Sequence, residues 1–207
     1  AAAEAAGARI VGLHAHAGSG VAEAEHWREI GTILAQAAER FDHVRLLNVG
    51  GGLGVPEMPD APVLDLAKVE RNLQTLKKAA PGFDLWMEPG RYLVAESGVL
   101  LTRVTQIKHT MSTRFIGVST GMNSLIRPAL YGARHEIVNL TRFGDAPAGM
   151  ASIVGPVCES ADLLGADRLM PETEEDDVIL IATAGAYGQV MGSRYNLREP
   201  AGEYVLD

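Results

Sequence analysis

The stretch Val44-Arg45-Leu46-Leu47-Asn48-Val49-Gly50-Gly51-Gly52 decides the fold of the first half of the chain. Its apolar run predicts a buried strand, and the glycines predict a tight turn at the carboxyl end of that strand. Two further short apolar runs end in the same way, in His14-Ala15-His16-Ala17-Gly18-Ser19 and in Glu88-Pro89-Gly90-Arg91. Residues 21–40 and 64–80, which separate these clusters, have apolar side chains at helical spacing. The clusters are therefore expected on one rim of a parallel sheet or (β/α) barrel, where such folds place their chemistry.

The pattern changes near Tyr92. Short runs rich in β-forming residues follow at 99–110, 115–119, 135–141, 152–157 and 178–181. They predict an antiparallel β domain over residues 94–207, with residues 172–177 as a solvated acidic turn. Residues 1–93 are expected to form a partial (β/α) barrel, because their three strand–helix steps are too few to close an eight-stranded one.

Composition excludes several classes of function. A net charge of −8 over 207 residues argues against a nucleic-acid binder and against binding to an anionic membrane surface. No run reaches the roughly 18 to 20 apolar residues that cross a bilayer. Residues 1–8 lack the features of a secretory signal. A single cysteine, Cys158, excludes an internal disulfide, so the cytoplasm is the expected compartment.

The strand-end clusters offer complementary chemistry. Backbone amides in the glycine run, together with Ser19, can hold a phosphate group. His14 offers a flat ring, and Glu88 can accept a hydrogen bond from a protonated ring nitrogen. Arg91 can hold a carboxylate or phosphate with its planar guanidinium. Together they predict a site for a phosphorylated, planar, nitrogen-bearing cofactor.

Each cluster taken alone also has a plainer interpretation. His14 and His16 can be packed, hydrogen-bonded histidines or, in principle, metal ligands, but no metal site is predicted because no third ligand stands at a suggestive spacing. The glycine run can be a simple turn. Glu88 and Arg91 can form an intrachain ion pair.

Polar residues of the second half add candidates for substrate binding. Arg127 and Tyr131 lie four apart and share a face on a helical turn, so they can bind a carboxylate or form a surface pair. Cys158 can donate a proton and Glu159 can bind an amine, although a lone cysteine is more often an inert buried residue. The phenol of Tyr187 can reach a phosphate or a substrate.

In order, these clusters resemble the fold-type III pyridoxal-phosphate (PLP) decarboxylases, in the diaminopimelate decarboxylase branch. The resemblance runs from about Ile10 to the end and rests on six segments: GLHAHAGS, NVGGGLG, EPGRYLVA, GMNSLIRPALYGARH, GPVCESADLL and TAGAYGQVMGSRYN. It implies that residues 1–93 are the C-terminal part of a PLP-binding (β/α)8 barrel of the TIM type. It also implies decarboxylation of meso-diaminopimelate to L-lysine and carbon dioxide in lysine biosynthesis, by a homodimer with shared active sites.

The resemblance also implies roles for the matched positions. His14 would stack on the cofactor ring, Glu88 would pair with the pyridine nitrogen, and Cys158 would protonate the carbon left after carbon dioxide departs. The implied phosphate pocket consists of Ser19, Gly51, Gly52 and Gly90. The implied contacts to substrate come from Arg91, Arg127, Tyr131, Glu159 and Tyr187, of which Arg91 and Tyr187 would also touch the cofactor.

The lysines depart from the family pattern. The family's PLP lysine lies on an early barrel strand, whereas Lys68, Lys77, Lys78 and Lys108 stand in no matching context. The chain is therefore expected to be the C-terminal part of a larger enzyme and to be inactive alone. Two alternatives stay open: a related decarboxylase acting on another diamino acid or a carboxylated polyamine, and a non-catalytic homologue of the PLP fold.

Overall fold

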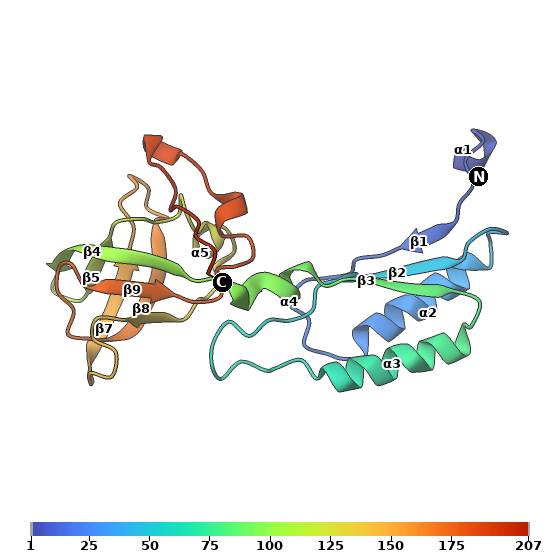
Figure 1. Ribbon diagram of the computed structural model, residues 1–207, viewed down its shortest axis with the longest axis horizontal. Helices are drawn as coiled ribbons and strands as arrows, with labels where there is room; N and C mark the ends of the chain where they lie inside the picture. The colour runs from blue at the N-terminus through green and yellow to red at the C-terminus, as the bar shows by residue number, and fades with distance from the viewer. Residues whose placement is uncertain (1, 207) are drawn as a thin grey trace. The chain divides into compact units, whose positions relative to one another are not determined.

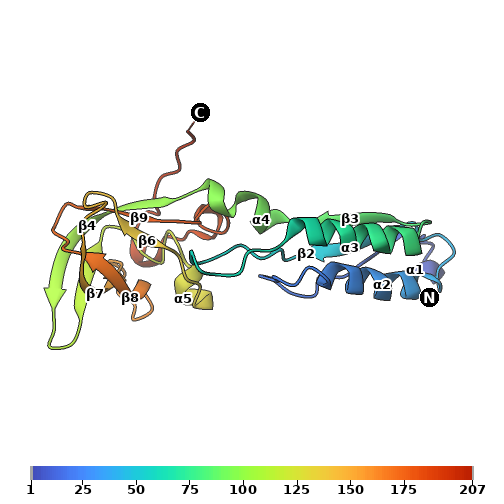
Figure 2. The ribbon, with the colours of Figure 1, turned by 90° about the horizontal axis from the view of Figure 1, so that it is seen from below.

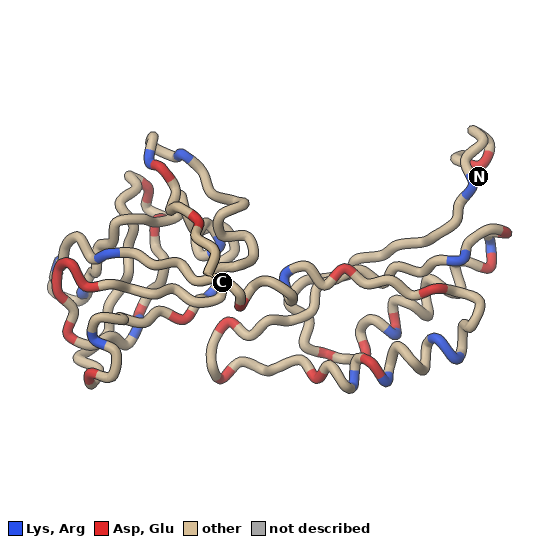
Figure 3. Tube along the Cα trace, viewed as in Figure 1, with Lys and Arg blue, Asp and Glu red and all other residues tan. Residues whose placement is uncertain are grey.

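The computed structural model describes residues 2–206, which divide into two compact units. The first unit contains the chain up to Pro56 and Pro62–Leu93, and the second contains Glu57–Ala61 and the chain from Val94 onward. The short segment Glu57–Ala61 thus packs with the second unit although it lies between two elements of the first. Acidic and basic residues are interspersed along both units (Figure 3).

The first unit is a parallel sheet with the order β1-β2-β3. Two helices, α2 and α3, lie on one face of this sheet (Figures 1 and 2). Its elements are α1 (Ala2–Ala5), β1 (Gly12–His14), α2 (His26–Ala38), β2 (Leu46–Gly51), α3 (Leu66–Ala79), β3 (Asp84–Glu88) and α4 (Gly90–Val94), whose last residue belongs to the second unit. In the register of the strands, His14 lies beside Asn48 and Gly51 beside Glu88.

The core of the first unit lies between the sheet and α2. Trp27, Ile30 and Leu34 form one buried face of α2 and pack with Leu47 and Val49 of β2. This is the apolar stripe expected of a helix that covers a sheet.

The second unit is a six-stranded sheet with the order β6-β9-β4-β5-β7-β8 (Figure 1). Its edge strands β6 and β8 also contact each other, so the sheet curls. Its elements are η1 (Ala95–Ser97), β4 (Leu100–His109), β5 (Arg114–Val118), α5 (Arg127–Tyr131), β6 (Ile137–Asn139), β7 (Pro147–Val154), β8 (Leu163–Pro171), β9 (Val178–Ile181), η2 (Gln189–Met191) and η3 (Tyr195–Leu197). Ile116, Ile153 and Ile179 are fully buried in its core.

The structure corrects the predicted antiparallel β domain in one respect. β5 and β7 pair in parallel, so the sheet is mixed. A parallel pair needs a long crossover, and residues 119–146, which contain α5 and β6, provide one. The acidic turn at 172–177 was also predicted to be solvated, but Asp177 is only 4% exposed. Its carboxylate accepts hydrogen bonds from Asn139, Arg142 and the backbone N–H of Glu174.

Candidate active site

The carboxyl ends of β1, β2 and β3 bring three polar side chains together. Nδ2 of Asn48 donates a hydrogen bond to Oε1 of Glu88 at 2.9 Å, and Nε2 of His14 lies 3.3 Å from Oε2 of Glu88. The side chains of His14 and Glu88 are each about half exposed, at 51% and 52%. One strand end therefore presents a flat ring beside an oriented carboxylate that solvent can reach.

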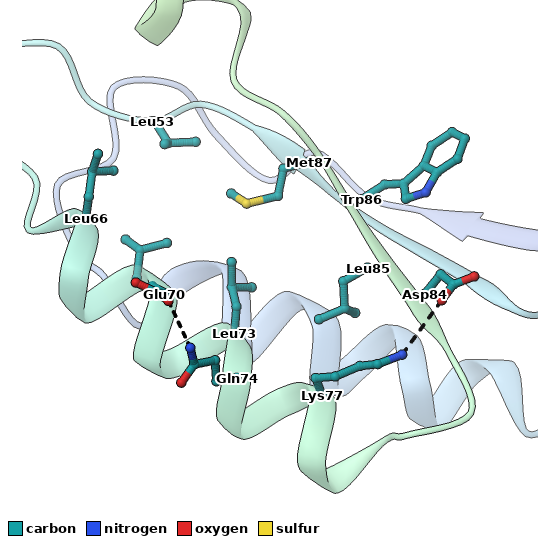
Figure 4. A pocket seen from close by; sticks show the side chains of 11 residues that line it. Leu53, Leu66, Glu70, Leu73, Gln74, Lys77, Asp84, Leu85, Trp86 and Met87 are labelled. Atoms are coloured by element: carbon teal, nitrogen blue, oxygen red, sulfur yellow. Dashed lines mark hydrogen bonds and ion pairs between the residues drawn. The ribbon is translucent and has the colours of Figure 1, made fainter.

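These side chains lie on the sheet face opposite α2 and α3. The register places His14, Asn48 and Trp86 side by side, and side chains of a strand alternate between faces, so Glu88 shares the face of Trp86. Figure 4 shows the other face of β3, where Leu85 and Met87 point toward α3 while Trp86 points away.

That helix-side face has an open, mainly apolar groove of about 710 Å³ between α3 and β3 (Figure 4). Leu66, Val69 and Leu73 of α3 line it together with Leu85 and Met87 of β3. No residue predicted for cofactor or substrate lines the groove, so it is separate from the polar strand ends.

The glycine run forms a tight turn in which no other type of residue can replace the glycines. Gly50 and Gly52 have positive φ angles of 74° and 83°. A Cβ on Gly51 would collide with the carbonyl oxygen of Glu88, and one on Gly52 would collide with the carbonyl oxygen of Gly18. The main chain after β2 is thus in contact with the loops after β1 and β3.

Side chains and backbone then fix this turn. The indole of Trp27 donates to the carbonyl of Gly51 at 2.9 Å from the core side. The N–H of Gly51 donates to Nδ1 of His16 at 3.1 Å, and Oγ of Ser19 lies 3.5 Å from Nε2 of the same ring. His16 is therefore an exposed, hydrogen-bonded histidine that links the predicted phosphate residues Ser19 and Gly51.

Arg91 and Gly90 follow Glu88 at the start of α4. Arg91 is half-buried, and the position of a Cβ on Gly90 would have open space around it. Gly90 and Arg91 thus follow closely in sequence on Glu88, the last residue of β3.

Arg127 of α5 lies in a buried polar cluster of the second unit. It is 6% exposed, its Nη2 donates to Oε1 of Glu57 at 3.0 Å, and its Nη1 lies 3.0 Å from Nε2 of His135. Nδ1 of His135 lies 2.8 Å from the carbonyl of Ala182, which can only accept a hydrogen bond. Nδ1 must therefore carry the proton and Nε2 accept from Arg127, which makes His135 neutral. Tyr131, at the other end of α5, is 64% exposed.

Cys158 and Glu159 stand side by side on an exposed turn after β7. Oε2 of Glu159 accepts a hydrogen bond from the hydroxyl of Tyr195 at 3.1 Å. That hydrogen bond and the negative charge of Glu159, the two largest causes, raise the pKa of Tyr195 above its usual value. The phenol of Tyr195, from η3, therefore meets the carboxylate of Glu159 beside the Cys158 thiol.

Tyr187 has a left-handed backbone with a φ angle of 60°, which is unusual for a residue with a side chain. Its side chain is about half exposed. A Cβ on the neighbouring Gly188 would collide with the carbonyl oxygen of Ala184, so the turn around Tyr187 is tightly folded.

Within each unit, the structure groups several predicted residues. It brings His14 and Glu88 into contact and places Ser19, Gly51 and Gly52 around one turn. The terminal nitrogens of Arg127 are engaged by the partly exposed carboxylate of Glu57 and by the ring of His135.

Sequence reasoning missed the partners of these residues. They are Asn48, Glu57, His135, Asp162 and Tyr195. All but Glu57 lie inside the six segments that carried the family resemblance. A polar residue inside such a segment was the signal in the sequence that pointed to these positions. The sequence did not show which residue each of them would contact in the folded protein.

The strand ends of the first unit fit a phosphorylated pyridine ring. The glycines at the end of β2 bring the main chain against the loop that carries Ser19. The N–H groups of Gly50 and Gly51 already donate to Asn48 and His16, so the Ser19 hydroxyl is the phosphate-binding group that this loop offers. Glu88 keeps a half-exposed carboxylate, the right acceptor for a protonated ring nitrogen, and the half-exposed His14 ring offers a stacking surface.

A metal centre is not found among residues 2–206. In this range, no group of three or more His, Cys, Asp or Glu side chains is placed to hold a metal ion. The helices of the same range are all too short or too polar to span a membrane.

Comparison with known proteins identifies relatives over nearly the whole chain. The profile "Pyridoxal-dependent decarboxylase, C-terminal sheet domain" matches residues 30–185. Diaminopimelate decarboxylase of Methanothermobacter thermautotrophicus is 38% identical over 207 aligned residues, which cover 95% of this chain and 48% of the relative. The chain thus spans about half the length of the curated relatives it matches.

Solved structures agree with this relationship. Diaminopimelate decarboxylase from Helicobacter pylori, complexed with L-lysine, superposes with a TM-score of 0.81 at 35% identity, covering 91% of this chain and 47% of that one. The structure of SrLDC in complex with PLP and cadaverine superposes with a TM-score of 0.87 at 25% identity, covering 97% and 53%.

Proposed function

The chain belongs to the pyridoxal-dependent decarboxylases, and from this premise we propose that it is the C-terminal part of an enzyme that converts meso-diaminopimelate into L-lysine and carbon dioxide. The observation that carries the proposal is the half-exposed carboxylate of Glu88, oriented by Asn48 beside the ring of His14 at the ends of parallel strands. The named relatives at 35–38% identity support the substrate.

PLP, when bound, would supply an electron sink for the bond that breaks. Glu88 would hold the proton of the ring nitrogen, and Asn48 would keep the accepting oxygen in place. His14 would stack on the ring. Gly51, Gly52, Gly90 and Ser19 would surround the phosphate, with Arg91 and Tyr187 at its edge.

The second unit would supply the residues that contact substrate. Arg127 and Tyr131, together with Arg91, would hold the carboxylates of the substrate. Arg127 has available for this only those N–H groups that Glu57 and His135 do not use. Glu159 would accept from the distal ammonium group, and Tyr187 would contact the substrate. Sγ of Cys158 would donate its proton to the carbon from which carbon dioxide leaves, and water would restore the thiol.

We further propose that the first unit is part of a (β/α)8 barrel within a domain spanning residues 1–93, with the sheet domain from residue 94. Three parallel strands with helices on one face support this assignment. So does the apolar groove between α3 and β3, because β3 is an edge strand of the sheet and a further strand–helix unit would cover it. The lysine that holds the cofactor would come from outside this chain, because none of Lys68, Lys77, Lys78 and Lys108 stands in the sequence context of the family's PLP lysine. Lys68 and Lys77 instead pair with Glu25 and Asp84.

A homodimer with shared sites and a cytoplasmic location complete the proposal. Cys158 and Glu159 lie exposed on a turn, as residues that complete a neighbour's site would. A cysteine that must remain a thiol to donate a proton favours a reducing compartment.

The direct test is a decarboxylation assay of the full-length protein with meso-diaminopimelate, with and without added PLP. Equal amounts of L-lysine and carbon dioxide are expected only with PLP. Absence of lysine at any PLP concentration contradicts the proposal.

A second candidate substrate is another diamino acid. This alternative is favoured by the similarity to SrLDC, whose structure was solved in complex with PLP and the diamine cadaverine. A panel of L-lysine, L-ornithine and meso-diaminopimelate separates the two.

A further inference from the structure

The turn that carries Cys158 and Glu159 is held by a buried carboxylate. Asp162 is 4% exposed, and its Oδ1 accepts the N–H of Met122 at 2.6 Å while its Oδ2 accepts the N–H of Val157 at 2.7 Å. A Cβ on Gly121 or Gly155 would collide with this carboxylate. Both glycines therefore make room for Asp162, which ties the Cys158–Glu159 turn to the turn Gly121–Ser124.

The turn Gly121–Ser124 also holds the segment that carries Tyr195. The carbonyl of Asn123 accepts the N–H of Ser193 at 2.8 Å, and Nδ2 of Asn123 donates to the carbonyl of Glu199 at 3.1 Å. Oγ of Ser124 accepts the N–H of Ala201 at 2.8 Å. Asn123 and Ser124 are both buried, so this attachment is part of the core.

The buried turn Gly121–Ser124 thus fixes two exposed segments, one carrying Glu159 and the other Tyr195, whose side chains meet. Their meeting point is the hydrogen bond from the Tyr195 hydroxyl to Oε2 of Glu159. Glu159 is exposed, and its other oxygen, Oε1, accepts a long hydrogen bond of 3.4 Å from the N–H of Ala161. Without Tyr195 its side chain would sample more rotamers. Tyr195 restricts that freedom, because Asn123 holds the chain on either side of Tyr195, at Ser193 and Glu199.

We propose that Tyr195 is a positioning residue that orients the Glu159 carboxylate for the distal ammonium group of the substrate, in a geometry built on the turn Gly121–Ser124. This inference rests on the proposed function for the identity of the substrate. The geometry of the contact itself does not depend on it. The pKa of Tyr195 is raised first by the hydrogen bond to Glu159 and then by the charge of that carboxylate, which agrees with a direct contact between the two groups.

The contact is tested first without any measurement of activity. Tyrosine ionisation is followed by ultraviolet absorbance in the full-length protein, and comparison with Tyr195→Phe assigns the Tyr195 transition. Glu159→Gln is expected to shift that transition to lower pH, because it removes the negative charge that raises the pKa. Tyr204→Phe is the matched control, since Tyr204 is 89% exposed and its removal should leave the assigned transition unchanged. A Tyr195 transition that stays at the same pH in the Glu159→Gln variant overturns the proposal.

Kinetics then test the positioning role. Tyr195→Phe is expected to raise KM for meso-diaminopimelate about three- to tenfold, as for loss of one hydrogen bond, with kcat within about twofold. Added to Glu159→Gln it should have no further effect, because both variants remove the same interaction. Full additivity would overturn the proposal. Failure of the wild-type protein to form lysine, with the titration shift intact, would contradict the proposed function and leave the Tyr195–Glu159 contact standing.

Discussion

The side-chain amide of Asn48 donates a 2.9 Å hydrogen bond to Oε1 of Glu88 across neighbouring parallel strands. The second carboxylate oxygen lies 3.3 Å from Nε2 of His14, and the Glu88 side chain is about half exposed. Glu88→Gln should lower kcat of the full-length enzyme by about a hundredfold, because a neutral amide cannot stabilise a protonated ring nitrogen. Asn48→Ala should lower it by about three- to tenfold, since only orientation is lost. Steady-state assays at saturating PLP measure both, and equal effects of the two variants would contradict these roles.

Substitution in the glycine turn should disrupt cofactor binding. Gly52→Ala places a methyl group against the carbonyl oxygen of Gly18 at a φ angle of 83°, so the loop after β2 must move. We expect a loss of about 2–4 kcal/mol in the free energy of unfolding and at least about tenfold weaker PLP binding, measured by urea denaturation and by fluorescence titration. Gly82→Ala is the control, because no atom lies within 4 Å of its Cβ position. It should change neither quantity measurably.

The ion pair between the buried Arg127 and the partly buried Glu57 should contribute to stability. Their side chains are 7% and 33% exposed, and Glu57→Gln leaves the Arg127 charge without its carboxylate. We expect the free energy of unfolding to fall by about 2–3 kcal/mol. The exposed pair of Arg194 and Glu199 provides the comparison: Glu199→Gln should cost less than about 0.5 kcal/mol. Similar losses for the two variants would show that burial does not matter here.

Asp177 should make the stability of the sheet unit depend on pH in the acidic range. Burial alone would raise the pKa of Asp177, but the Glu174 N–H, the Asn139 amide and the Arg142 guanidinium outweigh it and lower that pKa. Because the folded pKa lies below the unfolded one, the stabilisation is full above the unfolded value of about 3.9 and is lost as pH falls through the folded value. Asp177→Asn should therefore destabilise the protein at pH 7, and the difference from wild type should shrink below about pH 4. Urea titrations at several pH values measure this; a constant difference would refute it.

Shared active sites predict complementation between two inactive variants. Glu88→Gln and Cys158→Ala alter different proposed contributions to one site. If each site takes Cys158 from the neighbouring subunit, a mixed dimer has one intact site. An equal mixture after subunit exchange should then recover about a quarter of wild-type activity, from half the dimers with one of two sites intact. Mixing without recovery would indicate that both residues act within one subunit.

The arrangement of the strand ends follows from pattern and spacing. Parallel strands place their carboxyl ends at one edge, which is why a sequence-based prediction could group His14 with Glu88, 74 residues apart, and the structure shows them in contact. The glycines carried the same kind of information, because a φ angle above zero excludes most other residues.

The pairing of strands and side chains that lie far apart in the chain could not be predicted from the sequence in this way. β8 was missed because Asp167 has a φ angle of 49° and the register with β7 shifts several times, which breaks the alternation that marks a strand. The parallel pairing of β5 with β7 depends on the path of the crossover. Asp177 reads as one more acid in a run of acids, and only the folded chain shows that Asn139 and Arg142 meet it in the interior.

The segment Glu57–Ala61 has a practical consequence for dissecting this protein. It packs with the sheet unit, yet Pro62–Leu93 of the strand-and-helix unit separates it from Val94 along the chain. A truncation that begins at Val94 would keep Arg127 and His135 and discard Glu57, their acidic neighbour. Expressed alone, such a piece would hold an unneutralised guanidinium in its interior, so a single cut cannot release the sheet unit intact, whereas a permuted gene joining residues 57–61 to its start could.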